Sequence, residues 1–281
     1  MRWAARLVRG GGLRVHLISV LTACGVFAAV SLIPATSGAT GDALRGVRSA
    51  LHGGAGLSRT GQSFRGVAAV GALFTESSGR LGGHFCTASV VHSPHGDLAI
   101  TAAHCVTGGS GQLAFVPGYV NGAEPYGVWQ VTQVYTDQAW QSSHDPDDDV
   151  AFLRLSAAAG SPPVEDVTGA ELVGASAAGP GPSAPVPVRV IGYPNGAQQP
   201  VWCAGWTKDF SPTQLEFDCG GYTDGTSGGP FLTGVPDDSD HGTVIGVIGG
   251  YQQGGDTPQV SYSPVFGAAV ALLYQNAQAA S

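Results

Sequence analysis

Three short segments of the chain carry residues that could together perform acyl transfer. Ser227 lies in the sequence GTSGGP, His104 in TAAHC and Asp149 in DDVAFL. Acyl transfer needs a nucleophile, a base that takes its proton, a group that orients the base, and donors for a developing oxyanion. Glycines beside Ser227 permit unusual backbone angles and close approach of a carbonyl group. The backbone N–H groups of Gly225 and Ser227 are therefore candidate oxyanion donors.

Each segment also has an ordinary structural explanation when it is taken alone. A histidine at the end of a strand-like run is more often packed there than catalytic, and glycine-rich turns with a serine are common. Asp145, Asp147 and Asp148 read as a solvated acidic turn. Asp149 differs because it adjoins an apolar run, where a buried carboxylate can accept a hydrogen bond from an imidazole. The combination of the three segments is what favours catalysis.

In their order along the chain, His104, then Asp149, then Ser227, the segments resemble the trypsin/chymotrypsin-like serine peptidases, whose motifs are T-A-A-H-C, D-[IV]-A-x-L and G-[DN]-S-G-G-P. The resemblance covers about residues 66–275 and points to the bacterial secreted branch. It implies a serine endopeptidase with Ser227 as nucleophile, His104 as general base and Asp149 as the group orienting the base. Gly225 and Ser227 would form the oxyanion hole. A polypeptide substrate, an acyl-enzyme intermediate, a monomer and no cofactor are also implied.

Two other functions remain open at this point. A catalytically silent homologue could use the same cleft as a binding module, and an esterase could use the same site on activated esters. The presence of all three residues favours an enzyme over the silent module.

One departure from the family pattern concerns activation. Thr226 precedes the nucleophile, where most animal members carry an Asp that pairs with a new N-terminus after zymogen cleavage. The chain has no matching I-[IV]-G-G start. The trypsin-type activation switch is therefore not expected.

A second departure concerns the pocket for the substrate residue before the scissile bond. By the resemblance, Gly221 lies at the base of this pocket with Tyr222 beside it, so the Asp of trypsin-like members is missing. Ile248 stands where glutamyl endopeptidases carry a His, and Gly249 and Gly250 leave the pocket mouth open. These residues predict a preference for a medium-to-large apolar side chain.

Four cysteines follow residue 39, and their even number in an exported chain suggests two disulfides. Four cysteines permit three pairings, of which Cys86–Cys105 with Cys203–Cys219 closes two short loops. No C-x2-C pair is present, so zinc is not expected. His84, His92 and His95 lie close in sequence, but their spacing fits no metal-binding helix. We therefore expect three surface histidines and no metal site.

Composition and periodicity indicate an all-β protein. The chain has 281 residues, with 44 glycines and 18 prolines scattered among short apolar runs, and its net charge of −8 offers no basic patch for nucleic acid. Strand-like runs lie at 67–74, 85–91, 98–101, 112–115, 128–135 and 150–155, and again at 186–191, 201–206, 214–218, 231–233, 243–248 and 260–262. They predict two antiparallel six-stranded β-barrels and a C-terminal α-helix.

The peptidase domain would cover 66–281, with a first barrel at about 66–157, an inter-barrel linker at about 158–185, and a second barrel with the helix at about 186–281. Ser263-Pro264 predicts the start of that helix.

The N-terminus has the pattern of a targeting segment. Four arginines, an uncharged stretch and small residues before Ala39 describe a secretory signal peptide over 1–39. Residues 40–65 read as a linker or short pro-segment. The protein is then expected to be extracellular, without stable membrane association after cleavage. An uncleaved anchor, or a lipoprotein through Cys24, is the alternative.

Overall fold

A computed structural model describes residues 59–107, 111–156, 161–175, 184–236 and 239–280. The chain divides into a unit of residues 1–55 and a unit of residues 56–281, and every described residue belongs to the second. The signal peptide, Cys24 and most of the expected pro-segment lie outside the described residues.

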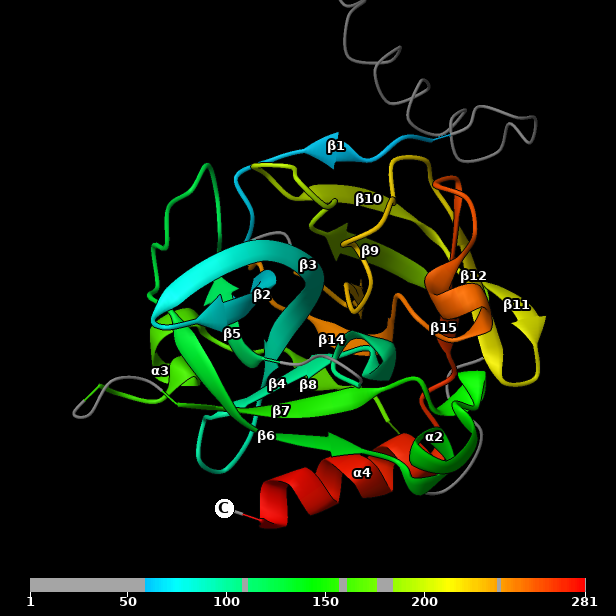
Figure 1. The fold of residues 1–281 in the computed structure, drawn as a ribbon. Coiled ribbons are helices and arrows are strands. Elements are labelled where there is room, and N and C mark those ends of the chain that lie inside the picture. Colours follow the sequence, from blue (N-terminus) through cyan, green and yellow to red (C-terminus); the bar gives the residue numbers. More distant parts are fainter. Residues whose placement is uncertain (1–58, 108–110, 157–160, 176–183, 237–238, 281) are drawn as a thin grey trace, which may run out of the picture. The chain divides into compact units, whose positions relative to one another are not determined.

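The first half of the described chain is a closed six-stranded antiparallel barrel in the order β2-β3-β4-β7-β6-β5 (Figure 1). Its strands are β2 (Val70–Ser77), β3 (Arg80–Val91), β4 (Leu98–Thr101), β5 (Gln112–Pro117), β6 (Trp129–Thr136) and β7 (Ala151–Ser156). Each strand overlaps one of the six runs predicted for this half. The β4 strand and most of β7 are buried, because their side chains fill the barrel on one face and pack under neighbouring elements on the other.

The second half consists of two sheets. A six-stranded sheet has the order β1-β10-β9-β13-β14-β8, and a three-stranded sheet has the order β11-β12-β15. Their strands are β1 (Gln62–Ser63), β8 (Leu172–Val173), β9 (Pro187–Gly192), β10 (Val201–Trp206), β11 (Lys208–Ser211), β12 (Gln214–Asp218), β13 (Pro230–Thr233), β14 (Thr243–Val247) and β15 (Val260–Pro264). The Cys203–Cys219 disulfide and a hydrogen bond from Gly249 N to Tyr262 O join the two sheets. The mostly β fold class with a C-terminal helix is confirmed.

Residues just before the expected domain boundary at 66 are part of this second half. Strand β1 pairs antiparallel with β10, and Gly61 N donates to Gly220 O over 2.7 Å. Phe64 packs edge-on against Trp202, with ring centroids 6.4 Å apart. The final residues of the segment expected to be a linker or pro-segment therefore add a strand to the peptidase sheet.

The connection between the two halves is also structured where it is described. It contains the short helix α3 (Val164–Thr168) and β8, which pairs parallel with β14. Glu171, just before β8, donates its N–H to Val90 O and accepts from His92 N with its carbonyl. The connection thereby contacts β3 of the first barrel and β14 of the second half. A single cluster of buried side chains, which includes Phe152 and Ile191, also spans both halves.

Helix α4 (Ala268–Ala279) ends the described chain and returns to the first barrel, beside β6 and β7 (Figure 1). Tyr274 stacks on Phe152 with ring centroids 5.2 Å apart, and Arg154 of β7 donates to the last carbonyls of the helix. The predicted helix start at Ser263-Pro264 is wrong. Both residues lie in β15, where Ser263 pairs with Leu215 and its hydroxyl accepts from Val247 N. Pairing in the sheet overrides the local capping pattern.

Four short helical turns complete the fold. They are η1 (Ala103–Cys105), α2 (Gln138–Ser143), η2 (Pro146–Asp148) and η3 (Tyr251–Gly254). Among them, η1, η2 and η3 lie at the site described below. Among the described residues, no helix has the length and apolar character needed to cross a membrane.

Candidate active site

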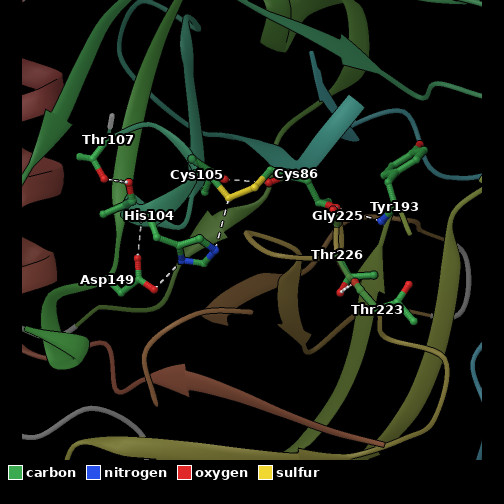
Figure 2. Close-up of a disulfide and its surroundings, with 12 residues drawn as sticks. Cys86, His104, Cys105, Thr107, Asp149, Tyr193, Thr223, Gly225 and Thr226 are labelled. Carbon is green, nitrogen blue, oxygen red and sulfur yellow. Dashed lines mark hydrogen bonds and ion pairs between the residues drawn. A yellow bond between two sulfur atoms is a disulfide. The ribbon is translucent and has the colours of Figure 1, made fainter. Parts of the chain in front are cut away.

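His104 is held in place by the end of a buried strand and by a disulfide. Strand β4 leads directly into η1, and the Thr101 hydroxyl donates to Thr87 O over 2.7 Å. Cys105, the next residue after His104, is bonded to Cys86 of β3, with Cα atoms 6.2 Å apart (Figure 2). The backbone at His104 is thereby fixed on both sides.

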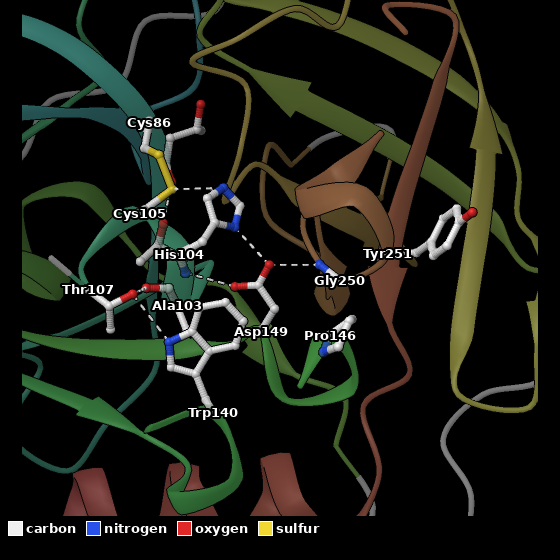
Figure 3. A network of polar contacts seen from close by, with 12 residues as sticks. Cys86, Ala103, His104, Cys105, Thr107, Trp140, Pro146, Asp149, Gly250 and Tyr251 are labelled. Carbon is white, nitrogen blue, oxygen red and sulfur yellow. Dashed lines mark hydrogen bonds and ion pairs between the residues drawn. A yellow bond between two sulfur atoms is a disulfide. The ribbon is translucent and has the colours of Figure 1, made fainter. Parts of the chain in front are cut away.

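Asp149 follows η2 and is completely buried. Its Oδ1 accepts from His104 N over 2.8 Å, and its Oδ2 lies 2.7 Å from His104 Nδ1 (Figures 2 and 3). A third hydrogen bond reaches Oδ2 from Gly250 N over 2.8 Å. An ionised carboxylate only accepts, so beside it a neutral imidazole would donate from Nδ1 and leave Nε2 as an acceptor, the tautomer that a general base requires.

The turn that carries Asp149 concentrates negative charge. Asp145 caps η2 by accepting from Asp147 N over 3.1 Å. Partial burial, and then the neighbouring carboxylates of Asp137, Asp145 and Asp147, raise the pKa of Asp148 to about 6. This edge of the site therefore favours positive groups.

Ser227 lies in a tight turn between β12 and β13 whose backbone is locked by the first barrel. Gly225 and Gly228 have φ angles of +92° and +80°, a region that favours glycine. A Cβ on Gly228 would lie 2.1 Å from Thr101 Oγ1 and 2.2 Å from Thr87 O, so only glycine fits there. Ser227 O accepts from Thr87 N over 2.7 Å. The turn therefore packs directly against β3, which carries Cys86, and β4, which leads to His104.

His104 and Ser227 line the same cavity of about 660 Å³. His104 Nε2 lies 3.8 Å from Cys105 Sγ, and among the described residues no hydrogen bond joins it to Ser227 Oγ. Catalytic hydrogen bonds are often loose without substrate and tighten when it binds. The structure therefore brings His104 and Ser227 to one cavity, with Asp149 buried behind His104, the His104–Asp149 contact formed and the His104–Ser227 contact open.

Of the four backbone N–H groups from Gly225 to Gly228, two donate hydrogen bonds within the described residues and two do not. Thr226 N and Gly228 N are used within the fold, by Thr223 O and Ile248 O. Among the described residues, neither Gly225 N nor Ser227 N donates a hydrogen bond, whereas the Gly225 carbonyl is fixed by the Thr87 hydroxyl over 3.0 Å. These are the two N–H groups that the resemblance assigns to the oxyanion hole, and Ser227 lines the cavity.

The residues expected to form the substrate pocket are divided by the structure. Tyr222 and Ile248 line the 660 Å³ cavity. Gly221 instead lies against the N-terminal segment, and the place of a Cβ on it would be 3.7 Å from Gly61 N. Gly249 and Gly250 face Asp149, and Gly250 lines a neighbouring cavity of about 470 Å³.

The cavity wall is more polar than the sequence suggests. Besides Tyr222 and Ile248 it includes Asn195, Thr223, Asp224, Thr226, Gln252, Gln253, Asp256, Thr257 and Ser261. Asp256 accepts from Gln252 Nε2 over 2.7 Å. The polar residues beyond Tyr251 were missed because they come from a loop whose length and path no local pattern predicts.

Both disulfides predicted by the short-loop pairing are present. Cys86–Cys105 and Cys203–Cys219 are separated by 19 and 16 positions in the sequence. In the described part of the chain, one group of three potential metal ligands lies close together, formed by Cys86, His104 and Cys105. Its two sulfur atoms are consumed by the disulfide, which leaves a single free ligand.

The three histidines considered for a metal site have different surroundings. His92 and His95 are exposed, and His92 Nδ1 lies 2.6 Å from Glu165 Oε1. The prediction that His84 lies at the surface is wrong. It is buried beside Phe74 and Tyr119 at the junction of the two halves, with its Nε2 2.9 Å from Ala197 O. An aromatic cluster, rather than a ligand set, explains its position.

Three positioning contacts have no signal in the sequence. Trp140 of α2 packs beside Ala103 and donates from Nε1 to the Thr107 hydroxyl over 3.3 Å (Figure 3). Two further side chains hydrogen-bond across the two halves at the site: the Thr87 hydroxyl donates to Gly225 O, and Gln214 Nε2 donates to Asp147 Oδ1. Neither residue belongs to a motif, so only the folded arrangement reveals them.

Comparison with known proteins identifies the family. The sequence profile of the trypsin-like peptidase domain matches residues 86–247. No curated protein sequence matches the chain.

Solved structures agree with this result. The protease Anisep from Arthrobacter nicotinovorans is 26% identical, with a TM-score of 0.65 over 78% of this chain and 100% of its own. The thermostable serine protease AL20 from an extremophilic microorganism is 25% identical, with a TM-score of 0.62 over 76% of this chain and 98% of its own. A Glu endopeptidase, 15% identical with a TM-score of 0.60 over 79% of this chain and 97% of its own, shares the fold. The chain belongs to the trypsin/chymotrypsin-like serine peptidases and is a serine-type endopeptidase.

Proposed function

We propose that this peptidase is exported and cleaves polypeptides through Ser227, His104 and Asp149 by way of an acyl-enzyme. The observation that carries the proposal is the 2.7 Å contact between His104 Nδ1 and buried Asp149, beside the cavity that Ser227 lines. It leaves Nε2 as an acceptor within the cavity. A neutral imidazole of this tautomer is the base that a serine hydroxyl needs.

In the acylation step, Ser227 Oγ bonds to the carbonyl carbon of the scissile peptide while its proton passes to His104 Nε2. The carbonyl oxygen becomes an oxyanion that accepts from Gly225 N and Ser227 N, and one such donor is worth about 3–4 kcal/mol of barrier. Asp149 stabilises the imidazolium. The C–N bond then breaks, and the amine leaves with the proton from His104.

Deacylation repeats the same chemistry with water. Water loses a proton to His104 as its oxygen bonds to the acyl carbon, and the ester bond to Ser227 breaks as the proton returns to Oγ. The product is a free carboxylic acid. Asp149 holds the imidazole in place through both steps.

Export of the protein is supported by its two disulfides, which persist in oxidising compartments. We further propose that residues 1–39 are removed as a signal peptide and that the mature protein acts outside the cell. The N-terminal sequence of the protein recovered from the medium would test this. A protein recovered only from the membrane would instead support an anchor or lipidation at Cys24.

Labelling with a fluorophosphonate probe tests the site. We expect one adduct on Ser227 of the exported protein by mass spectrometry, and none in Ser227→Ala or His104→Ala variants of unchanged circular dichroism. Peptide hydrolysis should disappear in the same two variants. Failure of the folded wild type to react with the probe would support a silent binding module. Reaction with the probe and hydrolysis of an activated ester, without hydrolysis of peptides, would support an esterase.

A further inference from the structure

Asp149 receives only one hydrogen bond from the second half of the chain, among the described residues. Two of its three donors belong to His104 itself, and the third is Gly250 N. The preceding residue, Gly249, leaves no room for a side chain that could donate to the carboxylate, because a Cβ on it would lie 2.9 Å from Asp149 Oδ2. The position of the Gly250 N–H is therefore what anchors the carboxylate from the far side (Figure 3).

The segment that carries this N–H rests on the side chain of Gln214. Gln214 lies on β12 and is 4% exposed. Its Oε1 accepts from Tyr251 N over 3.0 Å, and a Cβ on Gly250 would lie 2.3 Å from the same oxygen. The amide therefore holds the chain directly after the Gly250 N–H and packs against Gly250 itself.

The other end of the Gln214 amide holds the turn that carries Asp149. Nε2 donates to Pro146 O over 3.1 Å and to Asp147 Oδ1 over 2.7 Å. The amide orientation is fixed by chemistry, because the two acceptors require the NH2 group and the Tyr251 N–H requires the oxygen. One buried side chain thus joins both segments that place Asp149.

We propose that Gln214 is a positioning residue of the active site, which sets the Asp149 carboxylate against His104 by joining η2 to the start of η3. The inference rests on the proposed function of Asp149. It explains why the position needs an amide: a carboxylate would face Pro146 O and Asp147 Oδ1, and an apolar side chain would remove the Gln214 partner of three partly buried polar groups. Gln214 touches neither substrate nor Ser227, and it acts through Asp149.

Kinetic parameters separate this role from a merely structural one. In Gln214→Met, which keeps the length of the side chain, we expect kcat to fall about 10- to 100-fold with KM within about twofold, because small displacements of a catalytic group have costs of this size. The low-field proton resonance of the His104–Asp149 hydrogen bond should shift or broaden. Gln275→Met, on the exposed face of α4, is the matched control and should change none of these.

An exchange of partners provides the second test. Gln214→Glu should lower kcat by repulsion from Asp147, Asp147→Asn should have little effect, and the two together should recover much of the loss because an amide again faces a carboxylate. Wild-type kcat in Gln214→Met, or a loss of kcat that only follows the unfolded fraction, would overturn the inference. If the wild type itself fails to label at Ser227, the proposed function has failed instead.

Discussion

The Thr87 hydroxyl of the first barrel donates a hydrogen bond to the Gly225 carbonyl of the second half over 3.0 Å. The Thr87 hydroxyl oxygen also accepts a hydrogen bond from Tyr193 N over 2.8 Å, and Thr87 is completely buried. With its carbonyl held inward by Thr87, the Gly225 peptide keeps a fixed orientation beside Ser227. One hydroxyl thus links the barrel interface to a proposed oxyanion donor.

Replacement of this hydroxyl should therefore reduce catalysis as well as stability. For Thr87→Val we expect kcat to fall about 10-fold, less than the 10²–10³ that accompanies complete loss of an oxyanion donor. The unpaired Tyr193 N–H should lower the free energy of unfolding by about 1–3 kcal/mol. Steady-state kinetics and urea unfolding measure the two effects.

Thr168→Val is a matched control for Thr87→Val. The Thr168 hydroxyl is also buried and donates to Val164 O over 3.0 Å, but Thr168 does not line the active-site cavity. This variant should lose stability and keep kcat. Equal kinetic losses in both variants would show that the effect on kcat is not specific to Gly225.

A buried carboxylate on the inter-barrel connection makes stability depend on pH. Burial raises the pKa of Glu171 from 4.5 to about 7, opposed by a hydrogen bond from Gly242 N and by Arg189, and assisted by Asp240. His241 Nδ1 lies 3.7 Å from its Oε1. Between pH 4.5 and 7 the unfolded chain releases this proton while the folded chain keeps it, so the free energy of unfolding should fall by about 3 kcal/mol and then level off.

Glu171→Gln removes this contribution and keeps an oxygen that can accept from Gly242 N. Relative to wild type, the free energy of unfolding of the variant should rise as pH increases from 4.5 to 7. Urea unfolding at several pH values checks this. Parallel pH curves for the two proteins would contradict the assignment.

The charge of the cavity wall predicts a preference among substrates. Asp224 and Asp256 line the cavity beside Ser227, and no lysine or arginine is among its described lining residues. Tyr222 and Ile248 can contact the apolar part of a long side chain. We expect peptides with Lys or Arg before the scissile bond to have a lower KM than the same peptides with Glu, whereas the sequence alone favours an apolar residue.

Asp256→Asn should raise KM for the cationic peptides about two- to fivefold, because an exposed ion pair is worth little more, and added salt should reduce the difference. Asp166→Asn, on the exposed face of α3, should leave KM unchanged. A panel of peptides that differ at one position measures both. Tightest binding of apolar peptides, unaffected by Asp256→Asn, would support the expectation from sequence.

The disulfide within the second half should contribute mainly to stability. Cys203–Cys219 closes a loop of 16 residues, for which about 2–4 kcal/mol is typical. Replacement of both cysteines by alanine should lower the free energy of unfolding by this amount in denaturant titrations without reductant. The variant should still respond to reductant through Cys86–Cys105. Unfolding curves identical to those of the wild type would show that this bridge is not stabilising.

Local sequence patterns predict much of this protein because they determine local structure. Alternating apolar runs gave the strands of the first barrel, and short loops between cysteines gave the disulfide pairing. The same reasoning failed at Ser263-Pro264, where a good helix cap is used as a strand because β12 and β14 supply its partners. Sheet pairing between distant segments decides that competition, and local propensity does not report it.

Contacts across the two halves could not be predicted for the same reason. Gln214 lies 65 positions after Asp149 and Thr87 lies 138 positions before Gly225, and neither has a motif of its own. His84 belongs to the same class, since its burial depends on Ala197 and Tyr193 from the other half. Sequence patterns identify the reacting groups, whereas their supports are determined by how the halves pack.

The short strand β1 has a consequence for the shortest chain that remains soluble. By pairing with Val201 and Trp202 of β10 it covers part of the outer edge of the six-stranded sheet. A chain that begins at residue 66 would leave those N–H and C=O groups unpaired, and a bare edge of this kind is a template for pairing with other chains. Proteolytic removal of residues 59–65 would thus turn the sheet into a site for self-association.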